Sequence, residues 1–185
     1  MKITGIILTG GKSRRMGTDK ALLQIDGKPL LDRAVEFCHL FCEEVLISSD
    51  MEEHEKVGIR RISDERKNCG PMGGIYSCMK QSSTDWHFIL SVDAPFIEIN
   101  FVRFLLNNSD QFEAVVPVHY GKKEPLIALY HRNTFGVVRS MLDKGNYKMH
   151  FLLEKVSTHF VEAEDWLEKY PKLFENLNYP DDLHR

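Results

Sequence analysis

The sequence predicts an α/β fold, a single domain over residues 1–185 built as a three-layer sandwich around a mostly parallel sheet. Apolar, strand-like runs alternate along the chain with amphipathic helical patterns, which is typical of successive βαβ units. No Pro/Gly/Ser-rich linker, internal repeat or low-complexity tract divides the chain. A length of 185 residues, with 43% hydrophobic and 28% charged residues, also suits one globular domain.

The first strand and the first helix come at the start of the chain. Residues Ile3 to Leu8 form an apolar run, which indicates a buried strand. Residues 22–25 lead into a turn at Asp26-Gly27, and Pro29 suits the first turn of a helix. The apolar face predicted for this helix consists of Leu30, Leu31, Ala34, Val35, Cys38 and Phe41.

The middle of the chain repeats the pattern of short strands and helices. Two strands are expected over residues 45–47 and 58–62, and Pro71 opens the next helix. Residues 88–92 predict a fourth strand, and Asn100 is expected to cap the helix that follows it.

The last part of the chain predicts further strands and helices. Two strands, over residues 114–118 and 126–130, flank a turn at residues 119–124. The remaining elements are expected to be helices over 134–142, 148–153 and 165–170, and a strand over 156–161.

The stretch from Leu8 to Lys20 carries the strongest functional signal. The adjacent glycines Gly10 and Gly11 let the backbone turn sharply after the first strand and present N–H groups to an anion. A nine-residue segment of this stretch contains four cationic side chains, namely Lys12, Arg14, Arg15 and Lys20. The combination predicts a phosphate-binding site. The alternative is an ordinary surface loop whose charges are solvated.

Two common phosphate-binding loops do not match this stretch. A P-loop requires G-x-x-x-x-G-K-[ST], but the position five residues before Gly11 is Ile6, and Gly5 is one residue out of register. A dinucleotide-binding fingerprint requires G-x-G-x-x-G, and Lys12 stands where its second glycine should be. The loop is therefore of a different kind.

Three polar sites that are distant in sequence follow the ends of predicted strands: the Gly10-Gly11 loop, Asp64 and Asp93. Because ligands of open α/β sheets bind beyond the carboxyl ends of the strands, these sites are expected to share one rim, as in an enzyme cleft. A carboxylate such as Asp93 suits Mg²⁺, which combines carboxylate, water and phosphate oxygens. The alternative for Asp93 is to cap a turn or the following helix.

Composition and charge narrow the class of protein. The net charge of −3 provides no overall positive field for nucleic acid or an anionic membrane. No apolar run approaches the roughly 20 residues of a spanning helix, and no secretory signal pattern opens the chain. Four cysteines without a C-x-x-C pair suit the reducing cytoplasm. Cys38 and Cys42 lie four residues apart, but their apolar neighbours favour core packing over a metal site.

The motif L-x-G-G-x-S-x-R-M-G-x-D-K after a first strand resembles the signature of the nucleotidyltransferases with a Rossmann-like, nucleotide-diphospho-sugar transferase-like fold. Within that superfamily the chain resembles the molybdenum cofactor guanylyltransferases of the MobA type. The resemblance covers nearly the whole chain. Its further motifs are Gly27-Lys28-Pro29-Leu30, Asp64, Gly70-Pro71-Met72-Gly73-Gly74, Asp93-Ala94-Pro95, Pro125-Leu126-Ile127-Ala128-Leu129 and Phe174-Glu175-Asn176-Leu177-Asn178-Tyr179-Pro180.

This resemblance implies transfer of GMP from GTP to the phosphate of molybdenum-bearing molybdopterin, with release of pyrophosphate. It implies that Lys20, Arg15 and Asp93 are catalytic and that Asp93 binds Mg²⁺. The residues implied to contact nucleotide or pterin are Leu8, Thr9, Gly10, Gly11, Lys20, Asp64, Gly70, Asp93, Asn176 and Asn178. The implied partners are GTP, molybdopterin and, transiently, proteins that make or receive the cofactor, in the cytoplasm and without nucleic acid or membrane.

Several residues depart from the family pattern or allow a second reading. Ser48-Ser49-Asp50 occupies a position that often carries asparagine, and Gly145-Asn146-Tyr147-Lys148 replaces a more arginine-rich segment. Gly73-Gly74 would admit a nucleotide base or serve helix packing, and Lys122-Lys123-Glu124-Pro125 would contact an acceptor phosphate or remain solvated. The alternatives are therefore transfer from CTP, transfer to a sugar or polyol phosphate, or GTP binding without chemistry.

Overall fold

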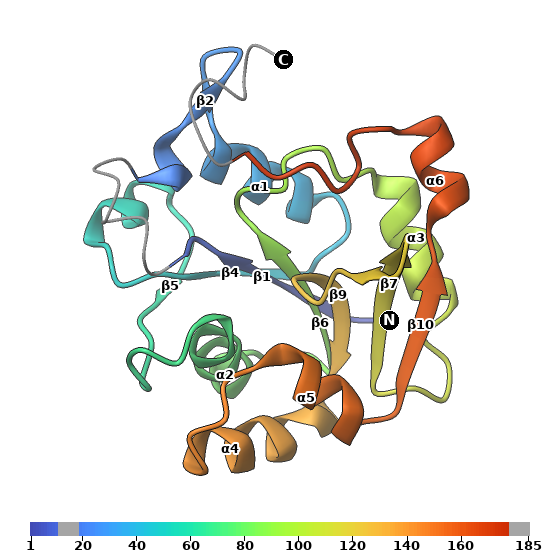
Figure 1. Ribbon diagram of the computed structural model, residues 1–185. Helices are drawn as coiled ribbons and strands as arrows, with labels where there is room; N and C mark the ends of the chain where they lie inside the picture. The colour runs from blue at the N-terminus through green and yellow to red at the C-terminus, as the bar shows by residue number, and fades with distance from the viewer. Residues whose placement is uncertain (11–18, 178–185) are drawn as a thin grey trace.

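The computed structural model describes residues 1–10 and 19–177. Its centre is an eight-stranded sheet with the order β10-β7-β9-β6-β1-β4-β5 (Figure 1). The eighth strand, β8, pairs with the C-terminal end of β7. A two-stranded sheet, β2-β3, lies apart from it. The strands are β1 Ile3–Leu8, β2 Gln24–Ile25, β3 Lys28–Pro29, β4 Glu44–Ser48, β5 Arg61–Ile62, β6 Trp86–Ser91, β7 Ala114–His119, β8 Lys122–Lys123, β9 Ile127–His131 and β10 Thr158–Glu162.

Helices cover both faces of the large sheet, so the molecule is the three-layer sandwich that the sequence predicts. Helices α1, α3 and α6 lie on one face, and α2, α4 and α5 lie on the other (Figure 1). The helices are α1 Leu30–His39, α2 Pro71–Gln81, α3 Ile99–Asn107, α4 Phe135–Asp143, α5 Met149–Lys155 and α6 Glu164–Lys169, with short 3-10 turns η2 Lys20–Leu22, η3 Glu52–Val57 and η4 Arg132–Thr134.

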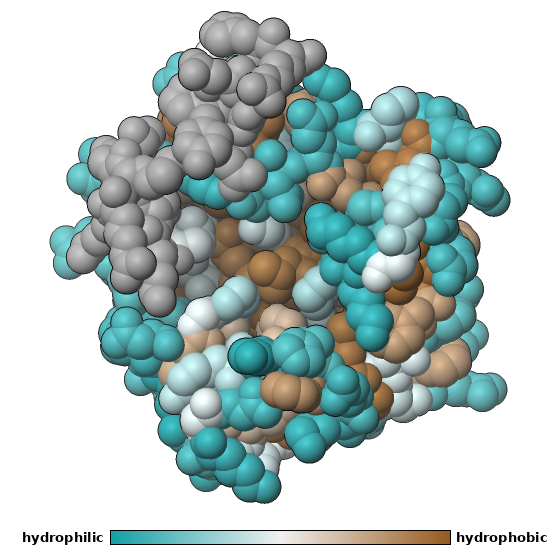
Figure 2. Space-filling view, viewed as in Figure 1, coloured by the Kyte–Doolittle hydropathy of each residue, from teal (hydrophilic) through white to brown (hydrophobic). Residues whose placement is uncertain are grey.

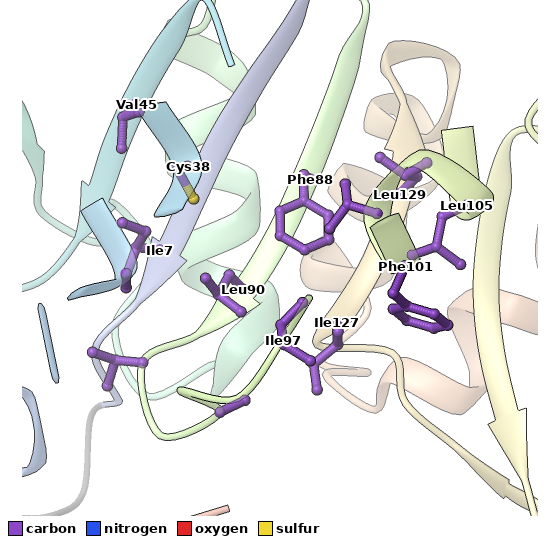
Figure 3. Close-up of a cluster of buried hydrophobic side chains, with 14 of the residues drawn as sticks. Ile7, Cys38, Val45, Phe88, Leu90, Ile97, Phe101, Leu105, Ile127 and Leu129 are labelled. Carbon is purple, nitrogen blue, oxygen red and sulfur yellow. The ribbon is translucent and has the colours of Figure 1, made fainter. Parts of the chain in front are cut away.

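The two hydrophobic cores follow from the alternation of side chains along the central strands. Ile7 of β1 and Phe88 of β6 pack with α1 and α3 in one core, which Figure 3 shows in close-up. Ile6 of β1 and Ile89 of β6 pack on the opposite side against α2 and α4. Every residue of β1 is buried, as expected for a parallel strand whose two faces are both covered by helices, and its one polar side chain, Thr4, is hydrogen-bonded to Glu44 and Thr84.

Strand direction decides which loops meet at the rim where β1 and β6 end. Strands β1, β4, β5 and β6 run parallel, and β7 and β10 run in the same direction. Strand β9 lies between β6 and β7 and is antiparallel to both. The sheet is thus mostly parallel, and the reversed β9 begins at the rim where its neighbours end.

The structure corrects three details of the expected elements. The strand expected over residues 58–62 is only Arg61–Ile62, because Gly58 ends the turn η3 in the left-handed region at φ 78°. Asn100 is not a cap: α3 begins at Ile99, and the Asn100 side chain accepts a hydrogen bond from Arg103. The turn at 119–124 contains β8, which folds back on β7.

The cysteines pack as expected. Cys38 is fully buried and Cys42 is half-buried, and a Cβ atom added at Gly5 of β1 would lie 3.1 Å from each of their sulfur atoms. The thiols of Cys38, in α1, and Cys42, just after α1, therefore fill the space beside Gly5 of β1. Over the part of the chain that the structure describes, no helix combines the length and apolar character needed to cross a membrane.

Candidate active site

The chain leaves the sheet at Thr9 and Gly10, directly after β1. The Leu8 carbonyl accepts a hydrogen bond from the Val92 N–H (3.0 Å), so the ends of β1 and β6 are joined. Thr9 is buried, and its hydroxyl donates to the Ser48 carbonyl at 2.9 Å, which joins β1 to β4. Gly10 then adopts φ 82°, a left-handed conformation that favours glycine. This conformation agrees with the role predicted for Gly10, whereas Gly11 lies outside the described residues.

The structure brings together two side chains for which catalysis is predicted. The Lys20 Nζ atom lies 3.2 Å from Asp93 Oδ2, although 73 residues separate them in sequence. The Ser91 hydroxyl donates to the other carboxylate oxygen of Asp93 at 2.6 Å. Both members of the ion pair are only partly exposed, 25% for the lysine side chain and 20% for the aspartate. A cation and a carboxylate therefore face each other at the rim.

The C-terminal segment 174–177 lies beside the same aspartate. The Leu177 N–H donates to the Asp93 carbonyl at 2.9 Å, so Asn176, its neighbour in sequence, is placed close to the β6 end. Phe174 stacks on the ring of His119 at 4.6 Å and packs edge-on against Phe101. The segment 174–177 thus lies between the loop after β6 and the end of β7.

Asp64 follows β5 and faces the ends of β4 and α2. The Ser48 hydroxyl donates to Asp64 Oδ1 at 3.3 Å, and the Asp64 N–H donates to the side chain of Asp50 at 3.2 Å. Burial, and secondarily the Asp50 carboxylate, raise the pKa of Asp64 above its ordinary value, while Ser48 and Lys67 oppose the shift. Perturbed carboxylates of this kind are common at functional sites.

The start of α2 explains the glycines of the Gly70-Pro71-Met72-Gly73-Gly74 motif. Gly70 precedes the helix at φ 59°, and Pro71 occupies the first helical position. A Cβ atom at Gly73 would lie 2.8 Å from the Arg66 carbonyl, and one at Gly74 would lie 2.1 Å from the Ser48 hydroxyl. The structure thus supports the helix-packing role of Gly73-Gly74, because the helix can approach β4 and Asp64 only without these side chains.

The face that carries these loops is recessed. In the space-filling view, apolar side chains lie deep in the middle of this face, between polar side chains on either side (Figure 2). Of the residues implied by the resemblance, the structure places Leu8, Thr9, Gly10, Lys20, Asp64, Gly70, Asp93 and Asn176 around the strand ends of this rim. Gly11, Arg15 and Asn178 lie outside the described residues.

Three residues of the rim were not predicted as functional. Ser48 binds both Thr9 and Asp64, as described above, and the adjacent Ser49 hydroxyl lies 2.7 Å from the ring of His54. The other ring nitrogen of His54 lies 2.7 Å from the carboxylate of Asp19, the residue before Lys20. The polar run Ser48-Ser49-Asp50 after a strand was the only sequence signal for this network.

The donor set of the rim fits a magnesium ion that is shared with a substrate. Among residues 1–10 and 19–177, no three His, Cys, Asp or Glu side chains converge on one point. Asp93 offers carboxylate oxygens beside Lys20 and close to the end of β1, and Mg²⁺ typically takes one or two carboxylates while phosphates and water complete its octahedron. The rim therefore suits Mg²⁺ bound together with a nucleotide.

Comparison with known proteins agrees with this geometry. A family model described as the MobA-like NTP transferase domain matches residues 5–160. A probable molybdenum cofactor guanylyltransferase of Halalkalibacterium halodurans is 35% identical to this chain, covering 97% of it and 94% of the relative. Another probable molybdenum cofactor guanylyltransferase, from Geobacillus sp. strain WCH70, is 30% identical over a match that covers 98% of this chain and 96% of the relative.

A solved structure agrees over the whole fold. The crystal structure of molybdopterin-guanine dinucleotide biosynthesis protein A from Archaeoglobus fulgidus superposes with a TM-score of 0.82 at 25% identity, covering 98% of this chain and 95% of that one. The family match spans the end of β1, Lys20, α2 and the turn at Asp93, whose described residues meet at the rim. The chain therefore belongs to the MobA-like NTP transferase family, among the molybdenum cofactor guanylyltransferases.

Proposed function

We propose that this protein transfers GMP from GTP to the phosphate of molybdenum-bearing molybdopterin, releasing pyrophosphate and forming the guanine dinucleotide form of the cofactor. Family membership supports the reaction. The observation that carries it in this chain is the Lys20–Asp93 pair at the end of β6, next to the bend at Gly10. A cation and a carboxylate that can bind a metal, beside a glycine at the end of a strand, suit a magnesium triphosphate.

The chemistry needs positioned charge rather than a general base. The acceptor is a phosphate monoester, which is mostly ionised near neutral pH and attacks the α-phosphorus of GTP directly. A P–O bond forms to the acceptor oxygen, the α–β bridging bond breaks, and its electron pair leaves on pyrophosphate. Lys20 would stabilise the charge that develops on the phosphate oxygens, and Arg15 would add a planar guanidinium. When bound, Mg²⁺ would polarise the phosphates and help neutralise the leaving group.

The ion pair also has a role before the substrate binds. Lys20 and Asp93 neutralise each other at 3.2 Å, which keeps a partly buried cation and a partly buried carboxylate compensated. In the proposed reaction, the triphosphate becomes a new partner for the lysine, and Asp93 Oδ2 becomes available as a metal ligand. Leu8, Thr9, Gly10, Asp64 and Gly70 would line the nucleotide site, together with Gly11.

The acceptor is proposed to bind on the opposite side of Asp93. Asn176, next to the Leu177–Asp93 hydrogen bond, would read the amide-like edge of the pterin, together with Asn178. We also propose a cytoplasmic location and transient contacts with proteins that supply or receive the labile cofactor.

A substrate panel tests the proposed function. The purified protein is incubated with Mg²⁺, molybdenum-bearing molybdopterin and each of the four common ribonucleoside triphosphates, and pyrophosphate release and the mass of the product are measured. We expect pyrophosphate and a guanine dinucleotide product with GTP, and none when EDTA removes the metal. A cytidylyl product, or turnover only with a sugar or polyol phosphate, would replace the proposed substrates. Tight GTP binding without pyrophosphate release under any acceptor would identify a non-catalytic protein.

A further inference from the structure

We infer that His54 and Ser49 are positioning residues that hold Lys20 in place for nucleotide transfer, acting through the carboxylate of Asp19. This inference rests on the proposed function of Lys20. The three side chains Ser49, His54 and Asp19 form a continuous hydrogen-bonded chain, called the relay below, which runs from the end of β4 to the residue before Lys20.

The relay is short and fully paired, and two of its three members are buried. His54 is 1% exposed and Ser49 is 5% exposed. The His54 Nε2–H donates to Asp19 Oδ2 at 2.7 Å, and the Ser49 hydroxyl donates to His54 Nδ1 at 2.7 Å, an assignment that follows from the pairing of all the groups. The Met51 N–H donates to the Ser49 hydroxyl oxygen at 3.0 Å, so this oxygen is also satisfied.

The Asp19 end of the relay fixes the backbone from which Lys20 projects. The second carboxylate oxygen of Asp19 accepts a hydrogen bond from the Ala21 N–H at 3.0 Å and caps the turn η2. Burial raises the pKa of Asp19, but the hydrogen bonds from His54 and Ala21 outweigh burial and hold the pKa below its ordinary value. Asp19 is therefore a charged anchor with donors on both oxygens.

The other end of the relay is fixed to the sheet. The Ser49 N–H donates to the Ile62 carbonyl at 3.0 Å, which places Ser49 between β4 and β5. The preceding residue, Ser48, accepts both hydrogen bonds from Thr9. Two consecutive residues at the end of β4 thus anchor the chain before the phosphate loop and, through His54, the chain after it. Misplacing a catalytic group by about 1 Å can cost about a hundredfold in rate, so such anchoring matters for turnover.

Two substitutions of His54 distinguish a positioning role of the relay from a role of the histidine in packing alone. The amide of His54→Gln can place a donor near the position of Nε2 and keep the bond to Asp19, whereas His54→Asn reaches only the Ser49 side. We expect His54→Asn to lower kcat for GTP-dependent pyrophosphate release about tenfold, with KM for GTP changed less than about threefold. His54→Gln is expected to recover kcat to within about threefold of the wild type.

A second buried histidine provides the matched control. His87 on β6 is also fully buried and lies 2.6 Å from a serine hydroxyl, that of Ser82, but it is at the end of β6 remote from Asp93. His87→Asn is expected to lower stability without lowering kcat. In the Lys20→Ala background, His54→Asn is expected to cost less than about twofold, since the relay acts through the lysine.

Three outcomes overturn the inference: unchanged kcat in His54→Asn, an equal loss in His54→Gln and His54→Asn, or a full tenfold further loss in the Lys20→Ala background. A crystal structure of His54→Asn gives a readout that needs no activity. The inference requires the Lys20 Nζ to Asp93 Oδ2 distance to increase beyond 4 Å, and a distance that stays near 3.2 Å overturns it. If the wild type releases no pyrophosphate with GTP, the proposed function fails. In that case the Lys20–Asp93 distance in His54→Asn still shows whether the relay holds Lys20 in place.

Discussion

Lys20 and Asp93 are the residues whose removal should have the largest effect on catalysis. Losing one preorganised stabiliser of transition-state charge typically costs about 3 kcal/mol, or about a hundredfold in rate. We expect Lys20→Ala and Asp93→Ala each to lower turnover about a hundredfold or more in the pyrophosphate assay. Circular dichroism is expected to show an intact fold for both, because each side chain lies at the rim and outside the two cores.

Lys2→Ala provides the control for these variants. Lys2 also pairs with a carboxylate, that of Glu43 at 3.3 Å, but its side chain is 77% exposed and lies next to the start of β1. Exposed pairs of this kind contribute little to stability. The control should keep wild-type turnover. Near-normal turnover in Lys20→Ala or Asp93→Ala would contradict the role assigned to that side chain.

Local chemistry was enough to single out Lys20 and Asp93, which the structure places together, whereas the residues that support them could not be found in this way. A glycine turn after an apolar run and a carboxylate at a strand end are visible within a few residues of sequence. The roles of Ser48 and His54 depend on how β4 pairs with β1 and on where η3 returns to the rim. Such long-range pairing leaves no local periodicity, and an isolated histidine or serine is not a signal by itself.

The start of α2 shows how closely a helix approaches the rim. A Cβ atom at Gly74 would lie 2.1 Å from the Ser48 hydroxyl and 3.2 Å from a methyl group of Leu8, so the helix or β4 would have to shift. We expect Gly74→Ala to lower the free energy of unfolding by about 1–3 kcal/mol, as overpacking usually does, and to weaken GTP binding. Urea denaturation and calorimetry with Mg²⁺ and GTP measure the two effects.

Gly136 in α4 is the matched glycine for this substitution. It is exposed, and a Cβ atom there would meet nothing within 4 Å. Gly136→Ala should therefore raise stability by about 0.5 kcal/mol through helix propensity alone and leave GTP binding unchanged. Equal stability changes at the two glycines would show that Gly74 is not a packing constraint.

Long periodic elements were predictable, and short ones were not. The strand at 3–8, the helix that follows Pro29 and the helix that begins at Pro71 match the predictions because apolar periodicity and proline chemistry agree there. Strand β5 has only two residues, and η3 has no apolar periodicity, so the run 58–62 was overextended. Asn100 has the chemistry of a cap, but the chain turns into the helix one residue before it.

The pH dependence of global stability should depend on His87. Burial lowers the pKa of His87 from 6.5 to about 4 in the folded protein. The unfolded chain takes up this proton near pH 6.5 and the folded chain only near pH 4, so stability is full above pH 6.5 and falls as the pH drops toward 4. We expect His87 alone to reduce the free energy of unfolding by about 2 kcal/mol between pH 7 and pH 5.

Urea titrations at pH 7 and pH 5 measure this contribution. His87→Asn removes the titrating group, so the variant should be less stable than the wild type at pH 7 and lose less stability on acidification. An identical pH dependence in the wild type and the variant would mean that His87 does not cause the loss of stability between pH 7 and pH 5.

The layered architecture followed from the sequence, but the strand order did not. Alternation of apolar runs and amphipathic helices requires a covered sheet, and the two cores on either side of β1 confirm it. Nothing in the run 126–130 shows that β9 inserts between β6 and β7 in reverse direction. The position and direction of β9 are determined by its pairing with strands such as β6, which lies more than 30 residues away in sequence.

The insertion of β9 also constrains how the protein is completed during translation. Strand β7 leaves the ribosome before β9, yet only β9 connects it to β6. Until residue 131 has emerged, β6 is the open edge of a partial sheet, which is the kind of edge that pairs with other chains. We therefore expect the sheet to be completed when the β7–β9 hairpin docks on β6 as a unit, after which β10 can add to β7 as the last strand.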